Sequence, residues 1–284
     1  MSGIPFIPRN KITKNSPQRV FLCYNGLMMD NSTNSLQPKT ETKKKPSVKS
    51  KLQRVRAKAL SSYYGNPIRD MKLICVTGTS GKATVAHFIH EILRAAGQHV
   101  AVLASDNPVK ISTLHKFLSE AWKAGSSYVV VTAPAESLEN NVFYGLPVYM
   151  AVLTNYVPSS LSTPSAEDFA ESESTLFKMS PEVVVLNEDD ANFPFFSRFT
   201  GRTDTLTYGT TRSSTLRIDG AKLYKKGTEA NLSLGSSRFS VASFLLGEPV
   251  VSYMACASAV ATALHVSNEA IADGIANYNP ENVE

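Results

Sequence analysis

Short apolar runs alternate with stretches of helical spacing between residues 72 and 186. The expected strands lie at 72–77, 99–103, 128–131, 148–154 and 183–186. The expected helices between them lie at 83–96, 111–124 and 166–178. Within each strand the apolar residues are consecutive rather than alternating, which is typical of strands covered on both faces. The pattern therefore predicts an α/β fold, with a mostly parallel, P-loop-type sheet flanked by helices.

The pattern changes after Phe199. From about 205 to 245 the chain consists of short runs rich in Thr, Ser and Gly, with turns at Gly220 and Gly235. Such runs are typical of a small antiparallel sheet near the C-terminal part of the domain. Closing helices are expected at about 251–276.

The N-terminal part of the chain differs from the rest in charge. Residues 1–60 contain 13 Lys and Arg and two acidic residues, whereas 61–284 contain 16 basic and 22 acidic residues, so the net charge of +5 combines an arm of about +11 with a body of about −6. The run from about Lys39 to Lys58 has almost no apolar residues before Leu52, so it cannot bury enough surface to fold alone. We therefore predict a disordered basic extension over 1–57 and one folded domain over 58–284.

Composition also limits the location and the partners. Three scattered cysteines without a C-x-x-C pair indicate reduced thiols. No apolar run approaches the roughly 18–20 residues that span a bilayer, so we expect a cytoplasmic protein without a membrane partner. An organellar location is the alternative, because residues 1–29 lack Asp and Glu, as transit peptides do. Nucleic acid is not expected as a partner, because no aromatic residues are interleaved with Lys43–Lys45.

The clearest chemical signal is the glycine-rich segment that joins the first strand to the first helix. Its backbone N–H groups, the helix N-terminus and a lysine ammonium are suited to a polyphosphate. The predicted nucleotide contacts in this phosphate loop (residues 78–84) are Gly78, Thr79, Ser80, Gly81, Lys82 and Thr84. Ala83 stands where such loops place a hydroxyl on Mg²⁺.

Several further motifs occur together in a fixed order. They are Tyr63–Pro67 before the first strand, Thr154-Asn155 after a strand, Leu176-Phe177 at a helix end, and Asn187–Asp190 after another strand. Together with the phosphate loop, this combination resembles the central, ATP-binding domain of the Mur ligases, most closely the UDP-N-acetylmuramoyl-tripeptide synthetases. The resemblance covers about 57–284. Folylpolyglutamate synthases share the loop but fit the downstream motifs less well.

The resemblance implies an ATP-dependent ligase that joins an acid to an amino acid through an acyl phosphate. It implies ATP and Mg²⁺ as cofactors, and a UDP-muramoyl peptide and an amino acid as substrates. It adds Asn155, Asn187 and Asp190 to the nucleotide contacts. Mur ligases carry a domain on each side of the central one, so we expect either a fragment of a longer protein or a partner chain that supplies the missing domains.

Several positions depart from the family pattern. The positions of the family's metal-binding glutamate, histidine segment, carbamoylated lysine and adenine-binding asparagines correspond here to Thr132, Ser159–Ser162, Glu173, and Val250 with Tyr253. The remaining candidates for catalysis are Lys82 and Glu173. The remaining candidates for a metal are Thr84, Glu136 and Glu173.

Three hypotheses follow. The favoured one is a nucleotide-binding domain that is impaired or inactive as a ligase, because losing one well-placed electrostatic group commonly costs about 10²–10³ in rate. The second is an active ligase with altered metal ligation, in which Glu173 supplies a carboxylate. The third is a structural or partner-binding module whose loop holds no nucleotide.

Overall fold

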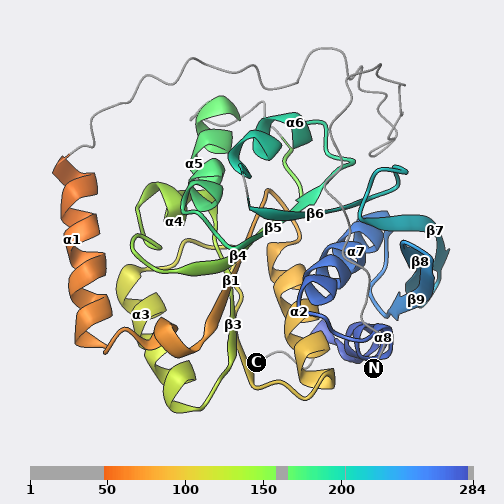
Figure 1. The fold of residues 1–284 in the computed structure, drawn as a ribbon, viewed down its shortest axis with the longest axis horizontal. Helices are drawn as coiled ribbons and strands as arrows, with labels where there is room; N and C mark the ends of the chain where they lie inside the picture. Colours follow the sequence, from red (N-terminus) through yellow and green to blue (C-terminus); the bar gives the residue numbers. More distant parts are fainter. Residues whose placement is uncertain (1–47, 158–165, 202, 281–284) are drawn as a thin grey trace. The chain divides into compact units, whose positions relative to one another are not determined.

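The computed structural model describes residues 48–157, 166–201 and 203–280 (Figure 1). The strands are β1 Lys72–Thr77, β2 Val100–Leu103, β3 Tyr128–Thr132, β4 Val148–Leu153, β5 Val183–Asn187, β6 Asp204–Gly209, β7 Leu216–Tyr224, β8 Gly227–Leu234 and β9 Ser237–Ser243. The α-helices are α1 Val48–Tyr63, α2 Lys82–Ala95, α3 Ile111–Lys123, α4 Ala135–Glu139, α5 Ala166–Lys178, α6 Phe193–Phe196, α7 Glu248–Ala263 and α8 Asn268–Asn277. Two 3₁₀ helices are η1 Pro67–Asp70 and η2 Ser197–Phe199. The predicted Ser159–Ser162 segment and the first 47 residues of the predicted extension lie outside the described residues.

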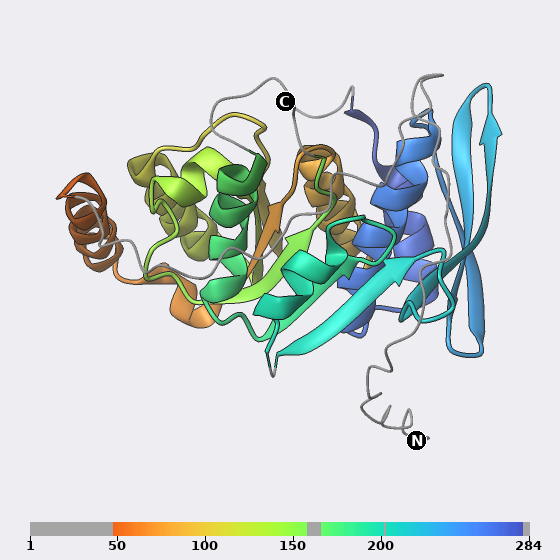
Figure 2. The same cartoon turned by 90° about the horizontal axis from the view of Figure 1, so that it is seen from above.

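One nine-stranded sheet runs in the order β2-β3-β1-β4-β5-β6-β7-β8-β9, and its neighbours from β2 to β7 are parallel. Strand β1 lies in the middle of the parallel part and is covered on both faces. Its Ile74 and Val76 pack into a core with α2, α7 and α8, whereas Leu73 and Cys75 pack with α3, α4 and α5. Helices cover both faces of the sheet (Figure 2). The predicted α/β fold is therefore confirmed. Among the described helices, none has the length and apolar character needed to cross a bilayer.

Strand β6 corrects one part of the prediction. The sequence pattern places the run 205–208 in the antiparallel sheet, but β6 pairs in parallel with β5, from Val183 opposite Asp204 to Asn187 opposite Tyr208. The chain reaches β6 through α6 and η2, and this crossover returns it to the same end of the sheet. Among the described strands, the antiparallel pairs are β7 with β8 and β8 with β9.

Helix α1 corrects a second part. The sequence predicts a disordered extension over 1–57, but its last ten residues belong to α1. The Arg54 Nε–H donates to Asn141 Oδ1 at 3.1 Å, and the guanidinium carbon lies 4.8 Å from the centre of the Tyr144 ring. Ala57 is fully buried. The Arg54 side chain thus attaches α1 to the turn after α4, although the basic composition of this segment suggests a solvated arm.

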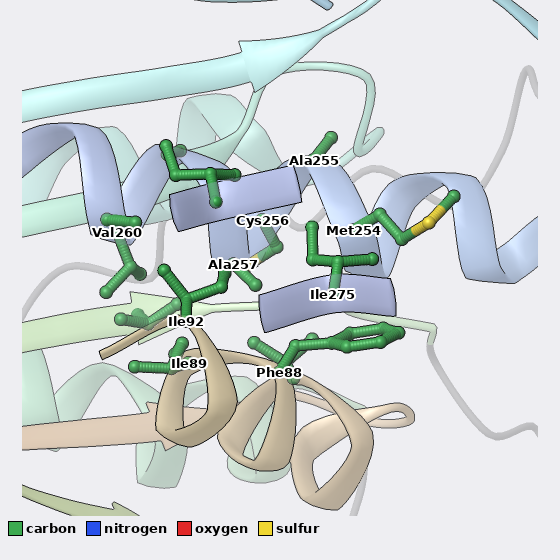
Figure 3. Close-up of a cluster of buried hydrophobic side chains, with 14 of the residues drawn as sticks. Phe88, Ile89, Ile92, Met254, Ala255, Cys256, Ala257, Val260 and Ile275 are labelled. Atoms are coloured by element: carbon green, nitrogen blue, oxygen red, sulfur yellow. The ribbon is translucent and has the colours of Figure 1, made fainter. Parts of the chain in front are cut away.

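Helices α2, α7 and α8 pack closely against one another (Figure 3). Phe88 and Ile92 of α2 belong to one apolar cluster with Met254 of α7 and Ile275 of α8, and all four side chains are fully buried. Gly274 of α8 lies directly on α2, because a Cβ there would be 2.3 Å from Ile92 Cα. The helix that begins at the phosphate loop is therefore held by backbone contact as well as by side chains.

This packing generates a stability prediction. Gly274→Ala should lower the free energy of unfolding by about 1–3 kcal/mol, because the new methyl group has no space beside the α2 backbone. Replacing glycine by alanine within a helix normally raises stability, so a loss of stability here would identify the steric contact with α2. Gly220→Ala is the control, since a Cβ there meets nothing within 4 Å. Urea unfolding measures both variants, and an unchanged or raised stability of Gly274→Ala would contradict the packing.

Candidate functional site

The predicted phosphate loop joins β1 to α2 at the carboxyl ends of the parallel strands. Gly78 and Gly81 have φ values of 132° and 76°, in the region that favours glycine. A Cβ on Gly78 would lie 2.2 Å from Thr154 Oγ1, and a Cβ on Gly81 would lie 2.2 Å from Cε1 of the Tyr253 ring. Neighbouring side chains therefore require both glycines, independently of their backbone angles.

The end of β4 holds the loop in place. The Thr79 N–H donates to Asn155 O at 2.9 Å, and the Ser80 N–H donates to Asn155 Oδ1 at 3.1 Å. The Thr154 hydroxyl donates to Ser80 O at 2.7 Å, and the Tyr253 hydroxyl lies 3.2 Å from Ser80 Oγ. Asn155 thus lies at the loop, as the prediction requires. Its backbone carbonyl and its side-chain oxygen accept from two backbone N–H groups that the sequence analysis assigns to phosphate binding.

Lys82 and the start of α2 form the cationic side of the loop. Lys82 is 6% exposed, and its ammonium donates to Gly78 O at 3.0 Å and Thr79 O at 3.3 Å. The Lys82 ammonium also lies 3.6 Å from Asp106 Oδ1. As at any helix start, the N–H groups of the first turn of α2, including that of Thr84, have no partner within the helix. Among the described residues, no side chain at the N-cap position accepts from them. This arrangement can accept a phosphate group.

Glu173 of α5 is a completely buried carboxyl beside the loop. Within the described part of the chain, neither of its oxygens has a hydrogen-bond partner. Burial raises the pKa of Glu173 to about 8, against the lowering effect of the Lys82 ammonium, and the Asp190 carboxylate raises it further. The Gly78 N–H faces the carboxyl and lowers this pKa without completing a hydrogen bond of ordinary geometry. At neutral pH the side chain is therefore mainly protonated.

The segment after β5 joins the ends of neighbouring strands. Asn187 Nδ2–H donates to Thr154 O at 3.3 Å. Asp190 accepts from the Tyr156 N–H through Oδ2 and from the Asn192 N–H through Oδ1. Burial raises the pKa of Asp190, and these N–H groups lower it. The structure thus brings Asn187 and Asp190 to the site, where they hold the chain that follows β4.

The predicted metal ligands are not brought together. Thr132 at the end of β3 is fully buried, and its hydroxyl donates to Ser105 O at 2.7 Å and accepts from the Ser105 N–H at 2.8 Å. Glu136 is exposed and lines a groove beside α1. Thr84 and Glu173 remain near the loop, and no cluster of three or more His, Cys, Asp or Glu suited to a metal occurs among the described residues. One hydroxyl and one protonated carboxyl do not fit the oxygen-rich shell of Mg²⁺.

Two residues of the site, Tyr208 and Asp106, are not identified from the sequence. Tyr208 is fully buried, and its hydroxyl donates to Thr154 O at 2.7 Å. A single tyrosine in a strand carries no sequence signal for this contact. Asp106, which pairs with Lys82, does carry one, because it follows the strand predicted at 99–103 and the ends of parallel strands meet at one edge.

The family follows from a comparison with known proteins. The family model that describes the Mur ligase middle domain matches residues 76–261, well over half of the chain. The chain belongs to the Mur ligase family. The UDP-N-acetylmuramoyl-L-alanyl-D-glutamate--2,6-diaminopimelate ligase of Bacillus licheniformis is 25% identical over 75% of this chain and 48% of its own length. The enzyme of the same name from Solibacter usitatus is 28% identical over 78% and 48%. The chain thus spans about half the length of these curated relatives.

Solved structures agree on the fold. A UDP-N-acetylmuramoyl-L-alanyl-D-glutamate--2,6-diaminopimelate ligase superposes with a TM-score of 0.72 at 24% identity, over 80% of this chain and 50% of that one. The MurF ligase from Thermotoga maritima in complex with ADP has a TM-score of 0.61 at 20% identity, over 76% and 52%. A Mycobacterium tuberculosis folylpolyglutamate synthase complexed with ADP and AMPPCP has a TM-score of 0.64 at 14% identity, over 81% and 64%. The predicted resemblance is therefore confirmed for fold and family.

The buried carboxyl generates a pH prediction. Glu173 has a pKa of about 8 in the folded chain and an ordinary value of 4.5 when unfolded, so the folded state binds more protons between these values. Stability should therefore fall as pH rises from about 4.5 to about 8, by at most about 1.4 kcal/mol per pH unit, and then level off. Glu173→Gln should remove this dependence.

Urea unfolding across that pH range measures the effect. Glu171→Gln is the matched control, because Glu171 lies two positions away on the same helix with a side chain that is 59% exposed. The burial argument fails if the stability difference between Glu173→Gln and the native chain stays constant with pH, or if Glu171→Gln gives the same change.

Proposed function

We propose that this domain binds the phosphate groups of ATP or ADP at residues 78–84 and does not catalyse the ligation performed by its relatives. The buried Lys82 beside the uncapped start of α2 supports phosphate binding. Structural neighbours described as complexes with ADP support an adenine nucleotide as the ligand. We place this nucleotide-binding role in the cytoplasm as part of the same proposal.

The observation that carries the loss of catalysis is the bonding of Thr132. The resemblance implies a metal-binding carboxylate at this position, but the Thr132 hydroxyl is engaged on both sides by the Ser105 backbone. Phosphoryl transfer depends on metal and cationic groups fixed around the developing charge. With the metal carboxylate absent and Glu173 mainly protonated, the site lacks the charges that this reaction requires.

Tyr253 supports a ligand held mainly through its phosphates. The resemblance implies an asparagine for adenine here, whereas the structure has an aromatic ring packed on Gly81 and a hydroxyl beside Ser80. An asparagine amide can both donate to and accept from adenine, whereas the aromatic ring of Tyr253 provides no such donor and acceptor pair. The affinity for the nucleotide should therefore come from the loop and Lys82.

Retained ligation is the second candidate function, and Glu173 favours it. Its unpartnered carboxyl lies beside Lys82, at the position that the resemblance assigns to a carbamoylated lysine. In that case a UDP-muramoyl peptide and an amino acid would be the substrates, and Mg²⁺ would need ligands from elsewhere. A partner chain or further domains would complete the site.

Nucleotide binding is tested by thermal unfolding with ATP. The native chain should be stabilised, by about 2.7 kcal/mol at a concentration of 100 times Kd, because the ligand binds only the folded state. Lys82→Ala should lose this stabilisation, since it removes the cation at the loop. Lys116→Ala is the control, because the Lys116 side chain is 67% exposed on α3. Unchanged stability of the native chain with ATP would overturn nucleotide binding and favour the structural-module hypothesis.

Catalysis is tested separately by phosphate release. The chain is incubated with Mg²⁺-ATP, UDP-N-acetylmuramoyl-L-alanyl-D-glutamate and 2,6-diaminopimelate, the compounds in the name of the relatives. We expect no release above the background of Lys82→Ala. Release that requires both substrates and is abolished by Lys82→Ala would establish the second candidate instead.

A further inference from the structure

Helix α1 carries an apolar stripe that no described part of the chain covers. Leu52, Val55 and Tyr63 are 51%, 64% and 81% exposed, and Ala59 between them is also exposed. Their spacing of three, four and four residues places them on one face of the helix. Figure 1 shows α1 at the margin of the fold, with α3 and α4 on one side of it only. We call these four residues the α1 stripe.

The α1 stripe borders a groove of about 960 Å³. Ala59 and Tyr63 form part of its α1 wall, and Val109, Ile111 and Val142 form part of the opposite wall. The groove therefore continues the apolar face of the helix into the body of the domain. An apolar stripe beside an apolar groove is the arrangement that receives one face of an amphipathic helix.

The rim of this groove is basic. Helix α1 contains five Lys and Arg and no acidic residue. Arg54 is directed inward against Tyr144, whereas Arg56 lines the groove opposite Lys110. Within the described part of the chain, neither Arg56 nor Lys110 forms an ion pair. Glu136 is the one acidic residue among the described residues that line the groove, so the rim favours a negatively charged ligand.

Charge argues against two possible occupants. Residues 1–47 contain eight Lys and Arg and two acidic residues, so this segment has the same sign as the rim. A second copy of the chain that docked by two-fold symmetry at this face would bring its own α1, with the same five cations, against the first. Like charges at an interface oppose association, so both occupants are disfavoured.

We propose that the α1 stripe and its groove bind an acidic amphipathic helix of a partner protein. Its apolar side chains would cover Leu52, Val55 and Tyr63, and its carboxylates would face Arg56 and Lys110. This interaction is independent of the phosphate loop and does not rest on nucleotide binding.

The test uses the full chain and a fluorescein-labelled synthetic helix with leucine at heptad spacing and glutamate at most other positions. Binding is followed by fluorescence anisotropy. Leu52→Asp should weaken binding by about tenfold or more, because it places a charge within the apolar contact. Added salt should weaken binding as well, because the Arg56 and Lys110 pairs are solvent-accessible. Leu223→Asp is the matched control, since Leu223 is exposed to a similar degree, 57%, on β7.

Four outcomes would overturn the proposal. The first is equal binding of a scrambled glutamate peptide or of a version with lysine in place of glutamate. The second is an equal loss of binding in Leu223→Asp and Leu52→Asp. The remaining two are detected with a photo-crosslinking amino acid in place of Val55, without peptide. Crosslinks to residues 1–47, or to a second copy of the chain, would show that this protein itself covers the stripe.

Discussion

The site depends on hydrogen bonds that converge on Thr154, at the end of β4. Its N–H donates to Thr77 O at 3.0 Å, and its hydroxyl donates to Ser80 O at 2.7 Å. Its carbonyl accepts from the Tyr208 hydroxyl at 2.7 Å and from the Asn187 amide at 3.3 Å. One residue thus joins β1, β4, β5 and β6 at the edge where the phosphate loop begins. The ends of the strands therefore hold the loop in position.

This constraint explains how the loop keeps its shape although several residues around it depart from the family pattern. Gly78 and Gly81 are required by contacts with Thr154 and Tyr253, and Lys82 is anchored on loop carbonyls. These contacts hold the fold of the Mur ligase middle domain whether or not a reaction takes place. Thr132 has no carboxylate that could bind a metal. Its hydroxyl instead forms hydrogen bonds with the backbone of Ser105. The loop geometry is therefore compatible with the proposed loss of ligation.

The sequence predicts the features that depend on local pattern. Consecutive apolar residues give the buried strand β1, and the spacing from Gly78 to Lys82 gives the loop. The sequence pattern misplaces β6, because a Thr-rich strand can pair in parallel or antiparallel. The direction of β6 is set by the crossover through α6 and η2, which the pattern does not reveal. It also misses part of α1, whose Arg54 contacts Asn141 and Tyr144 far along the chain. The buried state of Glu173 likewise depends on tertiary contacts that no local pattern records.

The central claim is that the loop binds phosphate although the metal-binding chemistry of the ligases is absent. A calorimetric titration of the full chain with ATP, in the presence and absence of Mg²⁺, tests it most directly. The account predicts measurable binding in both titrations with comparable affinity, because Lys82 and the start of α2 carry the interaction. Binding that requires Mg²⁺ would contradict it, since the site would then contain a metal shell that Thr132 and Glu173 do not provide.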